Sequence, residues 1–273
     1  MALLENDLFD GVRDKVKIAI ERIKAFEPKD GSGYYLAFSG GKDSIVIKDL
    51  MIKSGCKWDG HFNLTTVDPP ELIAYIRKYH KDIEENHPKE SMWKLIVKKM
   101  MLPTRVVRFC CDVLKEGGGK GRVVVTGVRW QESSKRKLRR MFEACSKGGK
   151  KFYLHPIIDW TDKEVWEYIR TNKLPYCCLY DQTYASGVKI TRIGCIGCPM
   201  AGDKRKDEFI KWPRFEKAYR AAAAAAAAHN RLYAGKTYSG DHERWVDGDA
   251  MFNWWMNDKH SKPDENQTCM IYE

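Results

Sequence analysis

The sequence predicts an α/β protein in which helices flank a parallel, twisted sheet, followed by a mainly helical C-terminal appendage. Apolar segments with strand character alternate with helical patterns over short links, which is typical of parallel strands joined by right-handed crossovers. From about Lys204 onward, charged residues alternate with bulky aromatic ones, which indicates further helices. We expect an N-terminal helix in residues 1–28, an α/β domain in 29–203 and a helical, aromatic-rich region in 204–273.

The individual elements follow from hydrophobic spacing. Apolar residues recur at helical intervals over residues 7–26, so a helix is expected to come first. Further helices are expected after residue 44, over 72–79, over 89–102 and after the capping box Thr161–Glu164. Strands are expected over 34–38, 61–67, 122–126 and 153–160. In sheets of this kind ligands bind at the carboxyl ends of the strands, so the site is expected there.

The most informative segment follows the first of these strands. It reads Ser39-Gly40-Gly41-Lys42-Asp43-Ser44 and leads directly into a helical pattern. The glycines let the backbone approach a ligand, and the helix N-terminus favours an anion such as phosphate. Lys42 adds a full positive charge, whereas Asp43 suggests an orienting or metal-linked role. A plain strand–turn–helix corner with an exposed Lys-Asp pair is the alternative.

Two other strand ends carry candidate ligand-binding residues. Thr66 and Asp68 follow the predicted strand 61–67, and we expect them to lie beside the glycine loop, flanking an adenosine. Gly127 and Arg129 follow the strand 122–126, where the glycine permits close approach and the arginine would bind a phosphate or sulfate. An ordinary surface arginine is the alternative for Arg129.

Composition limits the class of protein. The chain has 273 residues, 43% of them hydrophobic, which supports a packed core and argues against disorder. No apolar run reaches the length of a membrane span, so we expect a cytoplasmic protein without a membrane partner. The net charge of +11 favours a polyanionic partner, although basic clusters such as 135–140 and 204–206 also suit a solvated surface.

The cysteines point to metal or redox chemistry, because nine cysteines in a cytoplasmic chain do not indicate a disulfide framework. A C-x-x-C turn followed by proline is half of a typical zinc or iron–sulfur site. Two adjacent cysteines can bind separate corners of an iron–sulfur cluster more easily than they can both bind one tetrahedral zinc ion. We therefore expect a [4Fe–4S] cluster, with Zn²⁺ as the alternative, on Cys110, Cys111, Cys195 and Cys198. Cys177 and Cys178 could pack in the core, form a redox pair or serve as reserve ligands. Cys269 is either a mobile nucleophile or part of a frayed tail.

The glycine loop resembles the PP-loop of ATP pyrophosphatases, which split ATP between its α and β phosphates. Together with Thr126-Gly127-Val128-Arg129, the segment 155–161 and the two cysteine pairs, it makes residues 34–202 similar to the 3′-phosphoadenosine 5′-phosphosulfate (PAPS) reductase family. The resemblance implies an adenine-nucleotide-binding sheet. In the adenylylsulfate reductases of this family, the matching cysteines carry a [4Fe–4S] cluster.

Three functions follow from this resemblance. The intact loop favours an ATP- and Mg²⁺-dependent enzyme that adenylates an acceptor for sulfur transfer, with Lys42, Asp43 and Arg129 as catalytic residues and DNA or tRNA as acceptor. The alternative is a sulfonucleotide reductase that forms sulfite, in which Cys269 attacks sulfur, although its tail lacks the reductase motif. The third is a non-catalytic nucleotide- and cluster-binding accessory. Either enzyme also needs a protein that donates sulfur or electrons.

Overall fold

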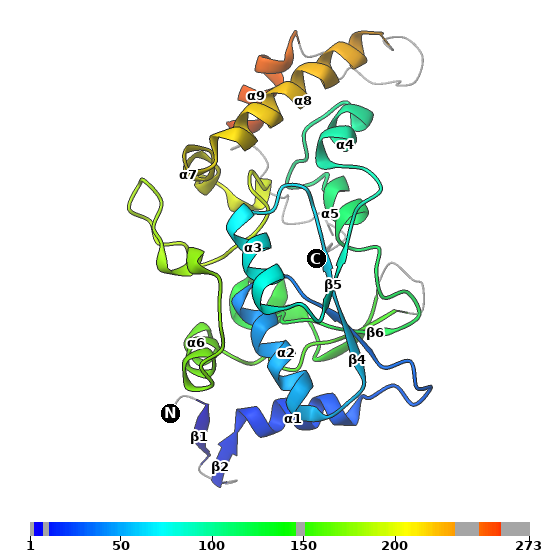
Figure 1. Ribbon diagram of the computed structural model, residues 1–273, viewed down its shortest axis with the longest axis vertical. Helices are drawn as coiled ribbons and strands as arrows, with labels where there is room; N and C mark the ends of the chain where they lie inside the picture. The colour runs from blue at the N-terminus through cyan, green and yellow to red at the C-terminus, as the bar shows by residue number, and fades with distance from the viewer. Residues whose placement is uncertain (1–2, 8–10, 146–150, 233–245, 258–273) are drawn as a thin grey trace. The chain divides into compact units, whose positions relative to one another are not determined.

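The computed structural model describes residues 3–7, 11–145, 151–232 and 246–257 of the chain (Figure 1). Contacts divide the chain into two compact units, each built from several segments. The first unit contains Met1–Asn63, Pro70–Asn86 and Gly118–Tyr180, and the second contains Leu64–Pro69, His87–Gly117 and Asp181–Glu273. This division follows spatial contacts, so it differs from the continuous domain boundaries expected from the sequence.

The first unit holds a six-stranded sheet in the order β5-β4-β3-β6-β8-β7. Its strands are β3 (Tyr34–Ala37), β4 (Trp58–Asn63), β5 (Ile83–Asn86), β6 (Val123–Val125), β7 (Phe142–Ala144) and β8 (Phe152–Leu154). Every neighbouring pair is parallel except β7 and β8, which are antiparallel. The predicted α/β class with a mostly parallel sheet is therefore confirmed.

Helices α1 (Lys15–Ala25), α2 (Lys42–Ser54), α3 (Pro70–Tyr79) and α6 (Asp162–Thr171) belong to the same unit. Helix α2 packs against both α1 and α6. The predicted capping box at the start of α6 is present, because Thr161 Oγ1 accepts from the Glu164 amide and Glu164 Oε2 accepts from the Thr161 amide. Two ion pairs connect α1 to the chain around α6, both at 2.7 Å: Lys15 with Glu164 is buried, and Arg22 with Asp159 is partly buried.

Several element boundaries differ from the sequence prediction. The expected helix over 7–26 begins only at Lys15, because Asp14 caps it and the preceding residues form an antiparallel hairpin of β1 (Leu4–Asp7) and β2 (Gly11–Asp14). The strand expected over 61–67 is β4, displaced toward the N-terminus by its register with β3 and β5. The strand expected over 153–160 ends at Leu154, and a turn that includes Pro156 follows it.

The second unit is helical and packs around one apolar cluster. Its helices are α4 (Met92–Lys99), α5 (Phe109–Leu114), α7 (Lys204–Lys211), α8 (Pro213–Leu232) and α9 (Gly248–Met256). Helix α8 contacts α4, α7 and α9. Ile96, Ala223 and Trp255 are fully buried within the cluster. Within the described ranges, no helix is long and apolar enough to cross a membrane.

Short 3₁₀ turns complete the described chain. In the first unit they are η1 (Trp130–Glu132) and η2 (Arg136–Leu138), and in the second η4 (Pro199–Ala201). A further turn, η3 (Cys178–Asp181), ends at the boundary between the two units.

Candidate nucleotide and thiol sites

The glycine loop joins the central strand β3 to the N-terminus of α2, as the sequence predicts. Gly40 has a φ of +70°, and a Cβ there would lie 2.7 Å from Ile76 Cδ1, so both backbone conformation and packing require glycine. Gly41 is the N-cap and offers no side chain to the helix. The Lys42 amide donates instead to the Tyr180 hydroxyl at 2.9 Å.

Two serine hydroxyls fix the shape of this loop. Ser44 Oγ donates to the Gly41 carbonyl at 2.9 Å, and Ser39 Oγ lies 3.2 Å from Ser44 Oγ. The Gly41 amide also donates to Ser39 Oγ, at 3.4 Å. The loop is therefore held at the helix N-terminus by its own side chains, where the partial positive charge of the helix suits an anion.

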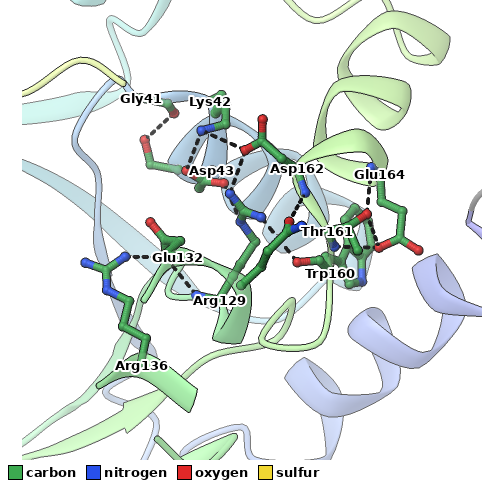
Figure 2. A network of polar contacts seen from close by, with 12 residues as sticks. Gly41, Lys42, Asp43, Arg129, Glu132, Arg136, Trp160, Thr161, Asp162 and Glu164 are labelled. Carbon is green, nitrogen blue, oxygen red and sulfur yellow. Dashed lines mark hydrogen bonds and ion pairs between the residues drawn. The ribbon is translucent and has the colours of Figure 1, made fainter. Parts of the chain in front are cut away.

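Four charged side chains converge beside the loop (Figure 2). Arg129 donates from Nε to Asp43 Oδ1 at 2.7 Å and from Nη2 to Asp162 Oδ1 at 2.9 Å. Lys42 Nζ lies 3.1 Å from the same Asp162 oxygen and 3.6 Å from Asp43 Oδ2. Two cations, each less than a tenth exposed, are thus balanced by two carboxylates of the chain.

Burial and close packing keep this group in place. Burial raises the pKa of Asp43, while attraction to Lys42 and Arg129 opposes that rise. Gly127 lies against Asp43, because a Cβ at Gly127 would be 2.8 Å from the Asp43 Cβ. The predicted close approach at this glycine is therefore to the α2 N-terminus. Glu132 accepts from the Arg129 amide at 2.9 Å and pairs with Arg136, so the turn after β6 is fixed as well.

Sequence reasoning missed Asp162 and Tyr180 as members of this site. The sequence pattern identifies the 161–164 segment only as a helix start and indicates no role for Tyr180. A signal existed for Asp162, since it begins the helix that follows β8, and β8 runs parallel to β6. Its side chain therefore reaches the same sheet edge as Arg129. Tyr180 lies in a turn, and its contact with Lys42 spans 138 residues without any pattern.

Thr66 and Asp68 lie in the second unit, whereas the glycine loop lies in the first. Thr66 has a φ of +64°, and its hydroxyl accepts from the Met92 amide at 2.9 Å, where α4 begins. Asp68 Oδ2 accepts from the Thr65 amide at 2.6 Å, and burial raises the pKa of this carboxyl. Asp68 thus stabilises a local turn and Thr66 binds the start of α4, and their place beside an adenosine stays a prediction.

The four cysteines expected to bind a cluster belong to the second unit. Cys110 and Cys111 lie in the first turn of α5, and Cys195 and Cys198 flank a turn at Gly197. Gly197 has a φ of +73°, and a Cβ there would lie 2.7 Å from Tyr219 Cε2. The turn therefore requires glycine between the two thiols.

The four thiols are close enough to affect one another electrostatically. The thiol of Cys110 donates to Cys111, which lowers the pKa of Cys111 and raises that of Cys110; negative charge on Cys195 and Cys198 raises the Cys110 pKa further. Attraction to Cys195 raises the pKa of the Lys115 ammonium group. Among the described residues, however, no three or more His, Cys, Asp or Glu side chains form a ready metal-binding group.

The remaining cysteines differ in their surroundings. Cys177 is fully buried in the first unit, and burial raises the pKa of its thiol to about 11, which fits the packing interpretation. Cys178 is exposed. Cys269, the candidate nucleophile, lies outside the described residues.

Residues 33–201, more than half of the chain, match the family model described as phosphoadenosine phosphosulfate reductase domain. An adenosine 5′-phosphosulfate reductase of Staphylococcus haemolyticus is 32% identical over 226 residues, which cover 75% of this chain and 86% of that protein. A probable FAD synthase of Schizosaccharomyces pombe is 28% identical over 64% of this chain and 66% of that protein.

An uncharacterized protein of Methanocaldococcus jannaschii is 29% identical over 77% of this chain but only 46% of its own length. A second uncharacterized protein of that organism matches this chain over 51% of its own length. The chain thus spans about half the length of these two curated relatives. Among solved structures, the PAPS reductase from Candida auris in a phosphate complex is 20% identical, with a TM-score of 0.47 over 64% of this chain and 90% of that one.

Proposed function

Because the chain belongs to the phosphoadenosine phosphosulfate reductase family, we propose that it binds ATP at the glycine loop and adenylates an acceptor. In this reaction an acceptor oxygen attacks the α-phosphorus of ATP, and the bond between that phosphorus and the α–β bridging oxygen breaks. The products are an adenylated acceptor and pyrophosphate. A sulfur donor would then displace the adenylate in a second step.

One observation carries this proposal: Lys42 and Arg129 meet at a single point beside the intact glycine loop. Two buried cations and a helix N-terminus suit the negative charge that develops on a leaving pyrophosphate, and cost little reorganisation because they are held in advance. Asp43 fixes the direction of Arg129 through its bond to Nε. Mg²⁺ would arrive with the ATP phosphates. The relative named as an FAD synthase supports ATP as the nucleotide.

The second unit would supply a [4Fe–4S] cluster. Cys110, Cys111, Cys195 and Cys198 offer four thiols, the number and type of donor that such a cluster takes, and Lys115 offsets their negative charge. The cluster would bind or activate sulfur when present. The net charge of +11 supports a nucleic acid, DNA or tRNA, as the acceptor.

The test is pyrophosphate release from ATP by anaerobically purified protein, with and without DNA or tRNA. Lys42→Ala should abolish release, because it removes one of the two buried cations. Lys53→Ala is the matched control, since Lys53 lies in the last turn of the same helix and is 38% exposed. Release that survives Lys42→Ala, or its absence under every condition, would contradict the proposal.

Sulfonucleotide reduction is the second candidate, and the 32% identity to an adenosine 5′-phosphosulfate reductase over 86% of that protein favours it. In this reaction a cysteine thiolate attacks the sulfur of the nucleotide and AMP leaves. A second thiol, from a donor protein, then reduces the resulting S-sulfocysteine and sulfite leaves. Sulfite formation that requires Cys269, without pyrophosphate release, would select this candidate. Nucleotide and cluster binding with neither reaction would indicate a non-catalytic accessory.

A further inference from the structure

One carboxylate oxygen of Asp162 contacts both buried cations of the candidate site, Lys42 and Arg129. Its Oδ1 lies 2.9 Å from Arg129 Nη2 and 3.1 Å from Lys42 Nζ (Figure 2). The side chains of Arg129 and Lys42 are 2% and 7% exposed, whereas that of Asp162 is 49% exposed. The carboxylate therefore lies between the two cations and the solvent.

The other contacts of Arg129 do not depend on Asp162. Its Nε donates to Asp43 at 2.7 Å, and its Nη1 donates to the Trp160 carbonyl at 3.2 Å. These two bonds fix the plane of the guanidinium group from the protein side. Only the Nη2 edge and the Lys42 ammonium group are directed at the half-exposed carboxylate. Arg129 can therefore keep its position when Asp162 moves away, and Lys42 Nζ still lies 3.6 Å from Asp43 Oδ2.

Asp162 is also not the residue that caps helix α6. The N-cap of α6 is Thr161, which forms the reciprocal bonds with Glu164. The Asp162 amide donates to Gln131 Oε1 at 2.6 Å, so the backbone is held independently of the carboxylate. A neutral side chain at this position should leave the helix start intact.

We propose that Asp162 is an internal counterion that a phosphate group of the bound nucleotide replaces. A non-bridging phosphate oxygen offers two cations the same contact as Asp162 Oδ1 does. Ligand binding then breaks two ion pairs of the chain before it forms its own, which lowers the affinity of the site for every anion. Weakly bound anions such as inorganic phosphate are thereby kept out. This inference rests on the proposed use of Lys42 and Arg129 as a phosphate site.

The same contact has a consequence for turnover. When pyrophosphate forms and leaves, Asp162 can pair again with Lys42 and Arg129, so the charge of the empty site is neutralised within the chain. Asp162 thus assists product release while it weakens binding. It is a displaceable counterion of the two cations rather than a group that attacks or donates a proton.

The test is to measure by calorimetry the affinity of the protein for inorganic pyrophosphate and for inorganic phosphate, at low salt and with EDTA. Asp162→Asn, and Asp162→Ser as a second variant with a small helix-starting residue, should bind both anions roughly three- to tenfold more tightly than the wild type, as expected when a partly exposed ion pair no longer competes. This gain should shrink as salt is added.

Asp82→Asn is the matched control, because Asp82 is 53% exposed and pairs at 2.5 Å with Lys48, a buried lysine of the same helix α2. It should leave affinity unchanged. Unchanged or weaker binding by both Asp162 variants, an equal gain in the control, or no binding by any protein would overturn the inference. Pyrophosphate release from ATP is a separate measurement, so tighter binding without adenylation would contradict only the proposed function.

Discussion

At the residue scale, the planar geometry of Arg129 organises the candidate site. Its three donor groups serve Asp43, the Trp160 carbonyl and Asp162, and the side chain is 2% exposed. A lysine has one ammonium group on a flexible stem and cannot reach three acceptors in these directions. Arg129 therefore holds the end of β6, the start of α2 and the start of α6 in a fixed relation.

We expect Arg129→Lys to lower the free energy of unfolding by about 2–4 kcal/mol, because Asp43 and the Trp160 carbonyl would lose charged hydrogen bonds in a mostly buried place. Denaturant titration measures this loss. Arg77→Lys is the control, since Arg77 is 59% exposed and pairs with Glu85, so its change should stay within about 0.5 kcal/mol. Equal losses in the two variants would contradict the argument.

The sequence indicated part of this residue-scale picture. The strand end and its glycine pointed to Arg129 as an anion-binding residue, because such positions face the ligand edge of a parallel sheet. Its partners could not be read from the pattern, since Asp43 lies 86 residues away and Asp162 lies 33 residues away. Short-range spacing carries no information on pairs formed by the sheet order.

At the element scale, a buried polar chain connects α2 to α3. Lys48 Nζ lies 3.0 Å from His80 Nδ1, and His80 Nε2 lies 2.7 Å from the Tyr75 hydroxyl, which donates to the Pro175 carbonyl at 2.7 Å. Because lysine can only donate, Nδ1 must accept and Nε2 must carry the proton. His80 is thus neutral. Burial, and to a smaller extent repulsion from Lys48, lowers its pKa to about 4.

This network predicts a pH dependence of stability. A histidine whose pKa falls on folding, from 6.5 to about 4, binds a proton more readily in the unfolded chain. Its contribution is complete above pH 6.5 and is lost as the pH falls toward 4, by at most about 1.4 kcal/mol per pH unit. Between pH 7 and 5, the wild type should lose up to about 2 kcal/mol more than His80→Gln in urea unfolding. Parallel losses would show that another group titrates.

The two strands of the six-stranded sheet that the sequence did not predict share one property. Strand β5 reads Ile-Glu-Glu-Asn and β7 reads Phe-Glu-Ala, so both are short and carry charge at a sheet edge. Charged residues on an edge strand prevent it from pairing with a further strand. The same charged residues interrupt the alternation of apolar and polar residues by which a strand is recognised in a sequence. The buried strand β3 and the capped helix α6 lack this conflict, and both were predicted.

At the scale of the whole molecule, the glycine loop with Lys42 and Arg129 belongs to the first unit, and the four cysteines proposed as cluster ligands belong to the second. We expect anaerobic reconstitution with iron and sulfide to give a cluster absorbance that is lost in Cys110→Ser and in Cys195→Ser. Cys56→Ser is the control, because Cys56 is a buried free thiol of the first unit. These variants should still bind ATP. Iron binding that survives both cluster substitutions would exclude the proposed ligands, and colourless zinc binding lost in both would select the alternative metal.

The division into units also affects how the chain can fold during synthesis. The chain passes from one unit to the other after residues 63, 69, 86, 117 and 180. Leu95 and Ile96 of α4 share their apolar cluster with Tyr219 of α8 and Trp255 of α9, which the ribosome delivers more than a hundred residues later. Nascent chains shorter than about 255 residues therefore expose this face of α4. Protection by a chaperone should matter most during that interval, and C-terminal truncation should cause aggregation rather than yield a smaller folded protein.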